Sequence, residues 1–243
     1  MADRSPRLAV LIDADNTSAK IAPGLFAEVA KIGEAVVRWI YGDFSSARSK
    51  TWASVLVEHA IVPKQQFANT TGKNASDITL VIEAMDLLHT GLYDGFCLVS
   101  SDSDFTRLAS RLREQGVAVY GFGERKTPES FRQACSRFIY TENLMAAPSS
   151  SSARATESGK LDRLETTIGN IISEAESNDG WVSLGGVGTR LANLAPDFDP
   201  RSYGFKKLSD LVRSMSTLEL SAEGTHPRLR LRPVKAKPRP KRR

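Results

Sequence analysis

Hydrophobic and polar positions follow two different periods along the first part of the chain. Short apolar runs predict buried strands, and the segments between them repeat apolar positions at the i, i+3, i+4 and i+7 spacing of a helix face. The expected strands are 8–12, 35–41, 61–67, 95–100 and 117–122, and the expected helices lie within 25–32, 49–60, 78–88 and 105–112. Strands that alternate regularly with helices predict an α/β fold, in which helices cover both faces of a parallel sheet.

A segment of small and polar residues then interrupts this pattern. Residues 148–159, PSSSSARATESG, predict a linker. The segments beyond it predict three helices and a two-stranded hairpin, at 161–172, 185–194, 203–215, 218–221 and 228–232. This succession is typical of a small winged-helix domain. We therefore expect one domain over 1–147 and a second over 160–233, followed by a basic, disordered tail at 234–243.

The net charge of +5 is concentrated at one end of the chain. The last twelve residues, RPVKAKPRPKRR, contain seven basic residues and no acid, so removing those seven leaves −2 for the rest. Such a run predicts either a contact with nucleic acid or another polyanion, or a solubilising end without a partner. The overall composition, 41% hydrophobic and 25% charged, is ordinary for a soluble globular protein.

The lengths of the apolar runs and the positions of the cysteines argue against several classes of protein. No apolar run approaches the roughly 18 residues of a membrane-spanning helix, so we expect no membrane association. Cys97 and Cys135 lie inside apolar stretches without metal-site spacing, which predicts a reducing, cytoplasmic setting.

Acidic residues follow the expected strands at the points where these strands end. Because the carboxyl ends of parallel strands meet at one edge of a sheet, these side chains are expected to converge there. The acids are Asp13 and Asp15 after the first strand, Asp43 after the second, Asp102 and Asp104 after the fourth, and Asp77 at the start of a helix. The amide of Asn16 follows Asp15. Each acid alone is also explained by a turn or a helix cap.

Taken together, these carboxylates predict a metal site. Several carboxylates at one edge, without matching Lys or Arg from the same loops, repel one another unless a divalent cation neutralises them. Ligation by carboxylates alone favours Mg²⁺ or Mn²⁺ over zinc, and such ions support phosphoryl chemistry.

Two phosphoryl-transfer chemistries fit this arrangement. The segment from Asp13 to Thr17, DADNT, resembles the DxDxT loop of haloacid-dehalogenase-type phosphatases. That resemblance implies that Asp13 is a nucleophile and Asp15 a general acid, with Lys73 as the required lysine. The segment SSDSDF lacks the glycine-led acidic motif of that superfamily.

The second chemistry is RNA hydrolysis. The segments LIDADN, YGDF, GKNASDITLVIEAMDLL and LVSSDSDFTRLASRLREQGVAVYGFG resemble, in order and spacing, the NYN family of PIN-like ribonucleases and its LabA-like branch. The resemblance covers residues 7–142. It implies a PIN-like (Rossmannoid) fold and a set of metal-binding, catalytic acids: Asp13, Asp77, Asp102 and Asp104. It further implies that Asn16 lies beside them, that Ser101 orients them and that Lys73 contacts a phosphate.

The later segment YGFKKLSDLV, residues 203–212, resembles the LOTUS domain, also called OST-HTH. That resemblance covers residues 158–233 and implies binding to RNA or to a protein partner. Lys206 and Lys207 open the expected recognition helix. Arg228, Arg230 and Arg232 alternate with leucines, so one face of a strand would present a row of arginines. This row suits a phosphate backbone, or else is the charged guard of an edge strand.

The sequence thus predicts an α/β PIN-like domain joined to a winged-helix domain. The expected function is a Mg²⁺- or Mn²⁺-dependent endoribonuclease whose second domain and tail bind single-stranded or structured RNA. The alternative is a non-catalytic RNA-binding module whose acids cap helices. A homodimer is left open by the sequence.

Overall fold

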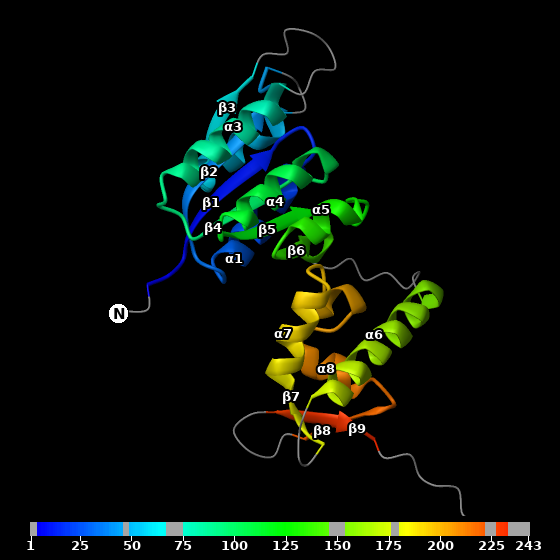
Figure 1. Ribbon diagram of the computed structural model, residues 1–243. Helices are drawn as coiled ribbons and strands as arrows, with labels where there is room; N and C mark the ends of the chain where they lie inside the picture. The colour runs from blue at the N-terminus through cyan, green and yellow to red at the C-terminus, as the bar shows by residue number, and fades with distance from the viewer. Residues whose placement is uncertain are drawn as a thin grey trace, which may run out of the picture. The chain divides into compact units, whose positions relative to one another are not determined.

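The computed structural model describes residues 4–45, 49–66, 75–145, 154–175, 180–221 and 227–232. The chain divides into two units (Figure 1). The first comprises Met1–Pro148 with Ala195–Phe198, and the second comprises Ser149–Leu194 with Asp199–Arg243. In the described segments, no helix is long and apolar enough to cross a membrane.

Six parallel strands form the sheet of the first unit, in the order β3-β2-β1-β4-β5-β6. They are β1 (Arg7–Asp13), β2 (Glu34–Gly42), β3 (Val62–Gln65), β4 (Gly95–Val99), β5 (Ala118–Gly123) and β6 (Arg137–Tyr140). All of β4, and all of β1 except Arg7, is buried. This is the expected environment of central parallel strands that have helices on both faces. The predicted α/β class is confirmed.

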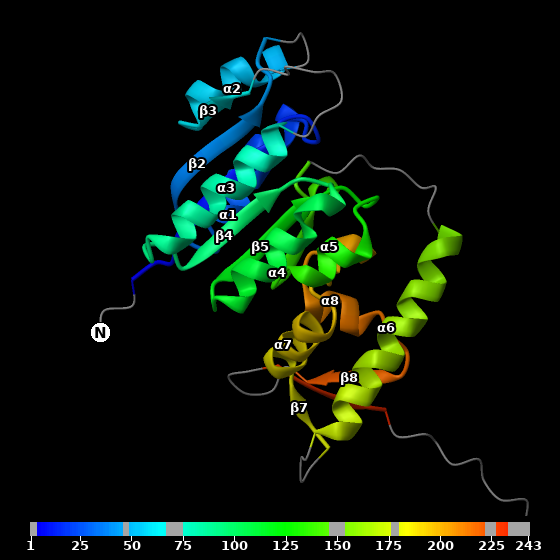
Figure 2. The same ribbon diagram turned by 45° about the horizontal axis from the view of Figure 1, so that its top comes forward.

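Helices cover both faces of this sheet (Figure 2). The α-helices are α1 (Ala22–Val29), α2 (Ala53–Glu58), α3 (Ala75–His89), α4 (Thr106–Glu114) and α5 (Glu129–Ala134). The short 3-10 helices of this unit are η1 (Ala19–Ile21), η2 (Ser49–Trp52), η3 (Ser103–Phe105) and η4 (Thr141–Asn143). The strands and helices therefore form three layers.

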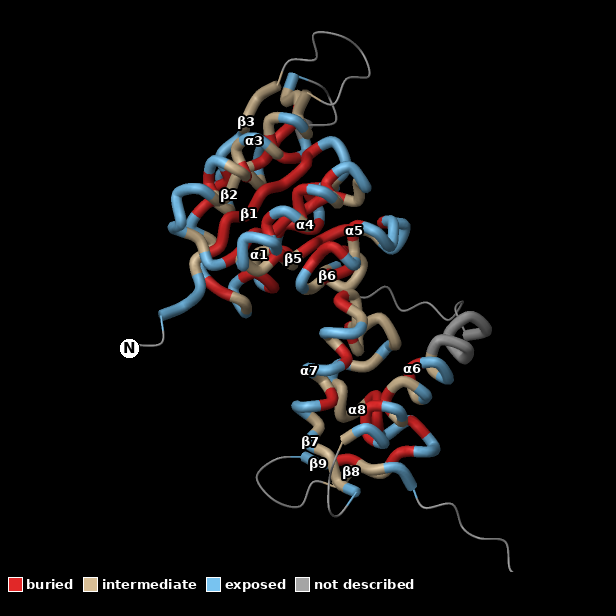
Figure 3. Tube along the Cα trace, in the orientation of Figure 1, coloured by how far each residue is buried: buried red, intermediate tan, exposed pale blue. Residues whose placement is uncertain are grey.

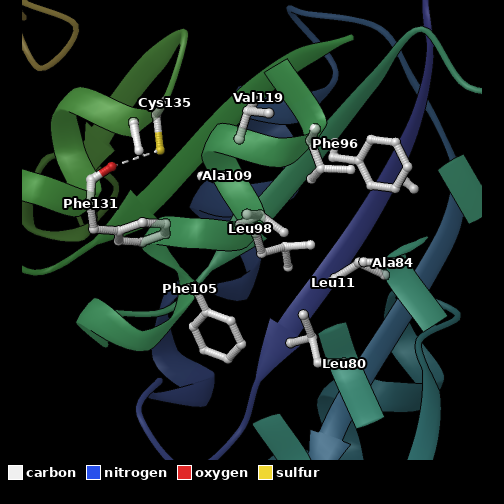
Figure 4. Packing of buried hydrophobic residues seen from close by; sticks show 14 of the residues in the cluster. Leu11, Leu80, Ala84, Phe96, Leu98, Phe105, Ala109, Val119, Phe131 and Cys135 are labelled. Carbon is white, nitrogen blue, oxygen red and sulfur yellow. Dashed lines mark hydrogen bonds between the residues drawn. The ribbon is translucent and has the colours of Figure 1, made fainter. Parts of the chain in front are cut away.

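The alternation of side chains along β1 divides the core into two halves. Ala9 and Leu11 pack among residues of α3, η3, α4 and α5. Figure 4 shows Leu11 with Leu80 of α3 and Phe105 of η3. Residues of the opposite parity, such as Val10, pack against α1 and Trp52. Figure 3 shows the same strand as a buried run between the more exposed helices. β1 is thus buried on both faces, and its last residue, Asp13, lies at the carboxyl edge of the sheet.

The described residues of the second unit form three α-helices, a 3-10 helix and a small antiparallel sheet. Its helices are α6 (Arg154–Glu174), α7 (Leu184–Leu194), α8 (Leu208–Arg213) and the 3-10 helix η5 (Pro200–Tyr203). The strands β7 (Val182–Ser183), β8 (Leu218–Ser221) and β9 (Arg228–Leu231) are ordered β7-β9-β8. Ile168, Leu191, Leu211 and Leu229 are among its buried residues. This arrangement agrees with the predicted winged helix.

Some elements differ from the prediction. The sequence pattern did not reveal α5, β6 or β7, because such short elements contain too few residues for a period to show. Helix α6 begins at Arg154, inside the expected linker 148–159. Ala, Arg and Glu favour helix, so the helix that the apolar face from Leu161 stabilises extends toward the N-terminus. The proposed domain boundaries stay a prediction.

Gly24 in α1 offers a test of the packing at the end of the first unit. A Cβ at this position would overlap the backbone carbonyl oxygen of Leu144. Alanine normally stabilises a helix relative to glycine, but here the carbonyl cannot give way as a flexible side chain would. We expect Gly24→Ala to lower the free energy of unfolding by about 1–3 kcal/mol, measured by urea denaturation.

Gly169 in α6 is the matched control for that substitution. A Cβ there would meet only Leu231 Cδ2, at an ordinary distance of 3.6 Å. Gly169→Ala is therefore expected to stabilise its unit by up to about 1 kcal/mol. Stabilisation of the first unit by Gly24→Ala would show that the close approach of Leu144 does not exist.

Candidate functional site

The carboxyl ends of β1 and β4 lie side by side at one edge of the sheet. Ile12 of β1 pairs with Val99 of β4 in parallel register, which brings the following residues, Asp13 and Ser100, next to each other. The loop after β1 continues from Asp13 to Asn16, and the loop after β4 continues to Asp102. The acidic segments of the sequence thus meet where the strand order places them.

Asp13 is 1% exposed and is held by four hydrogen bonds. Its Oδ1 accepts the backbone N–H groups of Asp15 (3.0 Å) and Asn16 (3.2 Å). Its Oδ2 accepts Asn16 Nδ2 (2.8 Å) and Ser100 Oγ (2.7 Å). Burial raises the pKa of Asp13, while these hydrogen bonds act in the opposite direction. The predicted contact of Asn16 with the acids is therefore present.

The serine that contacts the acids is Ser100 and not Ser101, so that part of the prediction was wrong. Ser100 Oγ donates to Asp13 and accepts the backbone N–H of Asp102 at 3.0 Å. Ser101 Oγ instead accepts the backbone N–H of Glu124 at 2.9 Å. Consecutive side chains at a strand end point to opposite sides, and Ser100 is the residue in register with Asp13.

The environment of Asp77 indicates that the acids lie close together. It lies in the first turn of α3. Burial, followed by the negative charges of Asp13, Asp102, Asp15 and Asp104, raises the pKa of Asp77 to about 6. Carboxylates from the loops after β1 and β4 and from α3 therefore lie close enough to repel one another. The four acids expected as metal ligands share one edge of the sheet.

The remaining acids differ in their exposure and in their hydrogen-bond partners. Asp102 is the N-cap of η3, where its Oδ1 accepts the backbone N–H of Asp104 at 2.9 Å. Asp104 and Asp15 are exposed, and Asp15 Oδ2 accepts Ser76 Oγ at 3.2 Å. Asp43 accepts three hydrogen bonds, two from Ser45 and one from Gln65, which lower its pKa. Asp43 thus stabilises the loop after β2.

The donor set suits a hard divalent cation. Carboxylate oxygens are the ligands that Mg²⁺ and Mn²⁺ prefer, and a cation would relieve the repulsion that raises the pKa of Asp77. Within the part of the chain that the structure describes, no three His, Cys, Asp or Glu side chains are arranged to hold an ion as they stand. Lys73, the expected phosphate contact, lies outside the described residues.

In the second unit, the predicted basic residues occupy two places. Lys206 and Lys207 are exposed, and Lys207 is the N-cap of α8. The arginines of β9 alternate with leucines, of which Leu229 is fully buried and Leu231 is 40% exposed. β9 is the middle strand of its sheet, so the edge-strand explanation for its arginines is wrong. Its pairing with β7 could not be foreseen from a two-residue strand.

Each of these arginines has a partner within the second unit. Arg228 Nη2 donates to the Trp181 carbonyl at 3.3 Å, and Arg232 Nε donates to the Leu218 carbonyl at 2.7 Å. Arg230 pairs with Glu219 at 2.8 Å and lies over the Trp181 ring at 4.5 Å. These interactions stabilise the small β-sheet of the second unit, and the ring of Trp181 packs against Arg230.

Taken together, the fold and the site define an α/β domain with a carboxylate edge, followed by a winged-helix domain. The sequence model of the NYN domain matches residues 7–145, and that of the OST-HTH/LOTUS domain matches residues 159–229. The first match spans more than half of the chain, which therefore belongs to the NYN family. NYN domains are generally PIN-like nucleases, and OST-HTH/LOTUS domains are associated with RNA binding.

The fold has a counterpart among solved structures. The chain is similar to a crystal structure of a protein of unknown function from Vibrio parahaemolyticus, with a TM-score of 0.51 and 17% sequence identity. The similarity covers 60% of this chain and 98% of that one, and it supports the fold alone. A search of curated proteins finds no match.

The burial of Asp77 and its repulsion by neighbouring carboxylates predict a pH-dependent stability in the absence of metal. Its folded-state pKa lies above the ordinary value of an aspartate, so the folded protein binds this proton more tightly than the unfolded chain does. Stability should therefore rise as the pH falls through 6 toward 4. In EDTA at about pH 7.5, Asp77→Asn is expected to raise the free energy of unfolding by roughly 1–2 kcal/mol, and at about pH 4 this gain should vanish.

Asp86→Asn on the exposed side of the same helix is the matched control. It should leave both the stability and its pH dependence close to those of the unmodified protein. Equal effects of the two substitutions, measured by urea denaturation at both pH values, would contradict convergence of the acids on Asp77.

Proposed function

We propose that the protein is a metal-dependent endoribonuclease that uses the carboxylate edge of its NYN domain. The observation that carries this proposal is the convergence of carboxylates from the loops after β1 and β4 and from α3, where burial and their mutual repulsion raise the pKa of Asp77 to about 6. Such repulsion costs stability, and a fold retains it where a bound cation compensates. An RNA phosphodiester is the substrate class that NYN membership and a LOTUS domain both favour.

The side chains that would hold Mg²⁺ or Mn²⁺ are Asp77, Asp102 and Asp104. Asp13 is buried beside them. The ion supplies activation of a water molecule and stabilisation of charge on the scissile phosphate. Asp13 accepts four hydrogen bonds, as many as its lone pairs allow, so direct ligation would require Asn16 or Ser100 to release it. Its fixed negative charge orients both loops whether or not it ligates the ion.

The residues around Asp13 position the site. Ser100 connects the two strand ends, because its hydroxyl donates to Asp13 while accepting the N–H of Asp102. Asn16 holds the other side of the same carboxylate. A loop that is fixed in this way keeps the Asp102 side chain at the edge of the sheet, where a substrate phosphate would approach.

The second domain would supply the attraction that the first domain lacks. An edge of carboxylates repels RNA, whereas Lys206 and Lys207 present exposed ammonium groups next to α8. Arg230 stacked on Trp181 adds a cationic and aromatic surface of the kind that nucleic acids contact. The basic tail at 234–243 lies outside the described residues and also carries positive charge.

Asp13 argues against phosphatase chemistry. A nucleophilic carboxylate has to direct a free lone pair at the substrate, yet Asp13 is 1% exposed and both of its oxygens accept two hydrogen bonds. The non-catalytic alternative has one observation in its favour. Asp102 caps η3 in the manner of a purely structural residue. The cleavage experiment below separates this alternative from the ribonuclease.

Cleavage of labelled single-stranded RNA tests the proposal. Asp102→Asn keeps an oxygen that can cap η3 but removes a charged ligand. We expect it to slow cleavage in Mn²⁺ by at least about 100-fold, and we expect EDTA to abolish cleavage by the unmodified protein. Asp86→Asn should retain the full rate.

The outcomes of that experiment separate the alternatives. Cleavage that persists in EDTA and in Asp102→Asn would refute a metal site at these acids. RNA that stays intact in every reaction but is still bound tightly would identify the protein as a binding module.

The dependence of RNA affinity on salt tests the role of the second domain. Each phosphate contact to single-stranded RNA contributes about 0.7 to the slope of log affinity against log salt. The double variant Lys206→Ala/Lys207→Ala is expected to lose up to about 1.4 of that slope, measured by fluorescence anisotropy in EDTA. Lys31→Ala, at the opposite edge of the sheet between α1 and β2, should leave the slope unchanged. An unchanged slope in the double variant would place the RNA elsewhere.

A further inference from the structure

An apolar hollow of about 250 Å³ lies beside the acids of the candidate site. Its described lining comes from α3 and η3 and consists of Asp77, Ile78, Val81, Ile82, Asp104 and Phe105. Apolar cavities of about 150 Å³ accept a benzene ring, so this hollow has room for a larger planar ring. Two of its lining residues, Asp77 and Asp104, are expected metal ligands. The hollow and the candidate site therefore adjoin.

Two isoleucines of α3 present open apolar surface to this hollow. Ile78 is 61% exposed and Ile82 is 55% exposed. They lie four residues apart, so their side chains are neighbours on one face of the helix. The core contacts of α3 are made by other residues, among them Leu80, Ala84 and Leu87, which are buried. A pair of adjacent apolar side chains that line a hollow favours a binding surface over chance exposure.

Acidic and apolar side chains adjoin on both walls of the hollow. On α3, Asp77 is followed about one turn later by Val81, so the apolar surface begins within roughly 5.4 Å of the acid along the helix. On η3, Asp104 directly precedes Phe105, which is 1% exposed and lines the hollow from the side of the core. An occupant of the hollow therefore meets carboxylates at one end and apolar surface at the other.

A nucleotide bound through the proposed metal ion satisfies both ends. Its phosphate would contact the ion at the acids, and its base, which only the ribose separates from the phosphate, presents a flat ring face to the apolar surface. The six described lining residues include no side chain that donates a hydrogen bond at neutral pH. The hollow is therefore suited to the face of a ring and not to reading the polar edge of a particular base.

We propose that this hollow binds a base next to the scissile phosphate, with Ile78 and Ile82 against the face of its ring. The inference rests on the proposed ribonuclease function and adds a base subsite to it. The faces of a base within a duplex are covered by the neighbouring bases, so only an unpaired, unstacked base can enter. The substrate is therefore single-stranded at this position, whatever its sequence.

The double variant Ile78→Ala/Ile82→Ala tests this subsite. The probes are oligouridine and an oligomer of the same length whose riboses carry hydrogen in place of the base. The unmodified protein should bind oligouridine more tightly, and in the double variant the ratio of the two affinities should fall about tenfold. The affinity for the base-free oligomer should not change, because the phosphate contacts are retained. Affinity is measured by fluorescence anisotropy in Ca²⁺, an ion that carboxylates also bind.

Cleavage of oligouridine in Mn²⁺ separates this inference from the function on which it rests. Cleavage by the unmodified protein, with an affinity ratio that is the same in the double variant, overturns the subsite and leaves the ribonuclease standing. A ratio that falls in the double variant, without cleavage by the unmodified protein, overturns the ribonuclease and supports the subsite. An unchanged ratio with an altered oligomeric state, measured by light scattering, overturns the subsite in favour of a protein interface.

Val57→Ala is the matched control, because Val57 is an 85% exposed apolar residue of another helix, α2. It should leave the affinity ratio unchanged. Alanine favours helix and both isoleucines are more than half exposed, so urea denaturation should show that the double variant remains folded.

A variant that strengthens the contact tests the same subsite in the opposite direction. Ile82→Trp offers an aromatic face on which a base can stack, so its affinity for oligouridine should rise about tenfold while that for the base-free oligomer stays the same. Val57→Trp adds the same side chain elsewhere and should raise neither affinity. Equal affinities of Ile82→Trp and Val57→Trp for oligouridine would refute the proposal.

Discussion

The structure depends on one buried charge, the carboxylate of Asp13 at the end of the central strand. A carboxylate in a protein interior is stable only where hydrogen bonds replace the water it has lost. Two of its four donors come from the backbone of its own loop, and the others come from Asn16 and Ser100. These bonds shape the loop after β1 and fasten it to the start of the loop after β4. The geometry of the candidate site follows from them.

The other carboxylates are placed at a cost to stability. Asp77 begins a helix, where the dipole favours an acid, but it also faces four negative charges. A fold that served packing alone would gain by placing neutral side chains here, and functional sites are the common exception.

The fold was largely predictable from local patterns, because strands buried on both faces are continuous apolar runs and amphipathic helices repeat every three to four residues. The α/β class, the order of most elements and the winged-helix arrangement needed nothing further. Elements as short as β6 and β7 form because a neighbouring strand supplies their hydrogen bonds. These strands contain too few residues for a periodic pattern, so the sequence does not predict which strand they pair with.

For the candidate site, the sequence by itself indicated which acids follow strand ends, and the resemblance to the NYN family implied the set Asp13, Asp77, Asp102 and Asp104. It could not determine which of two adjacent serines meets Asp13, because that depends on the register between strands far apart in the chain. It likewise could not show that Arg230 is paired with Glu219. Hydrogen-bond partners and cavities arise from the packing of distant segments, and only the tertiary structure decides them.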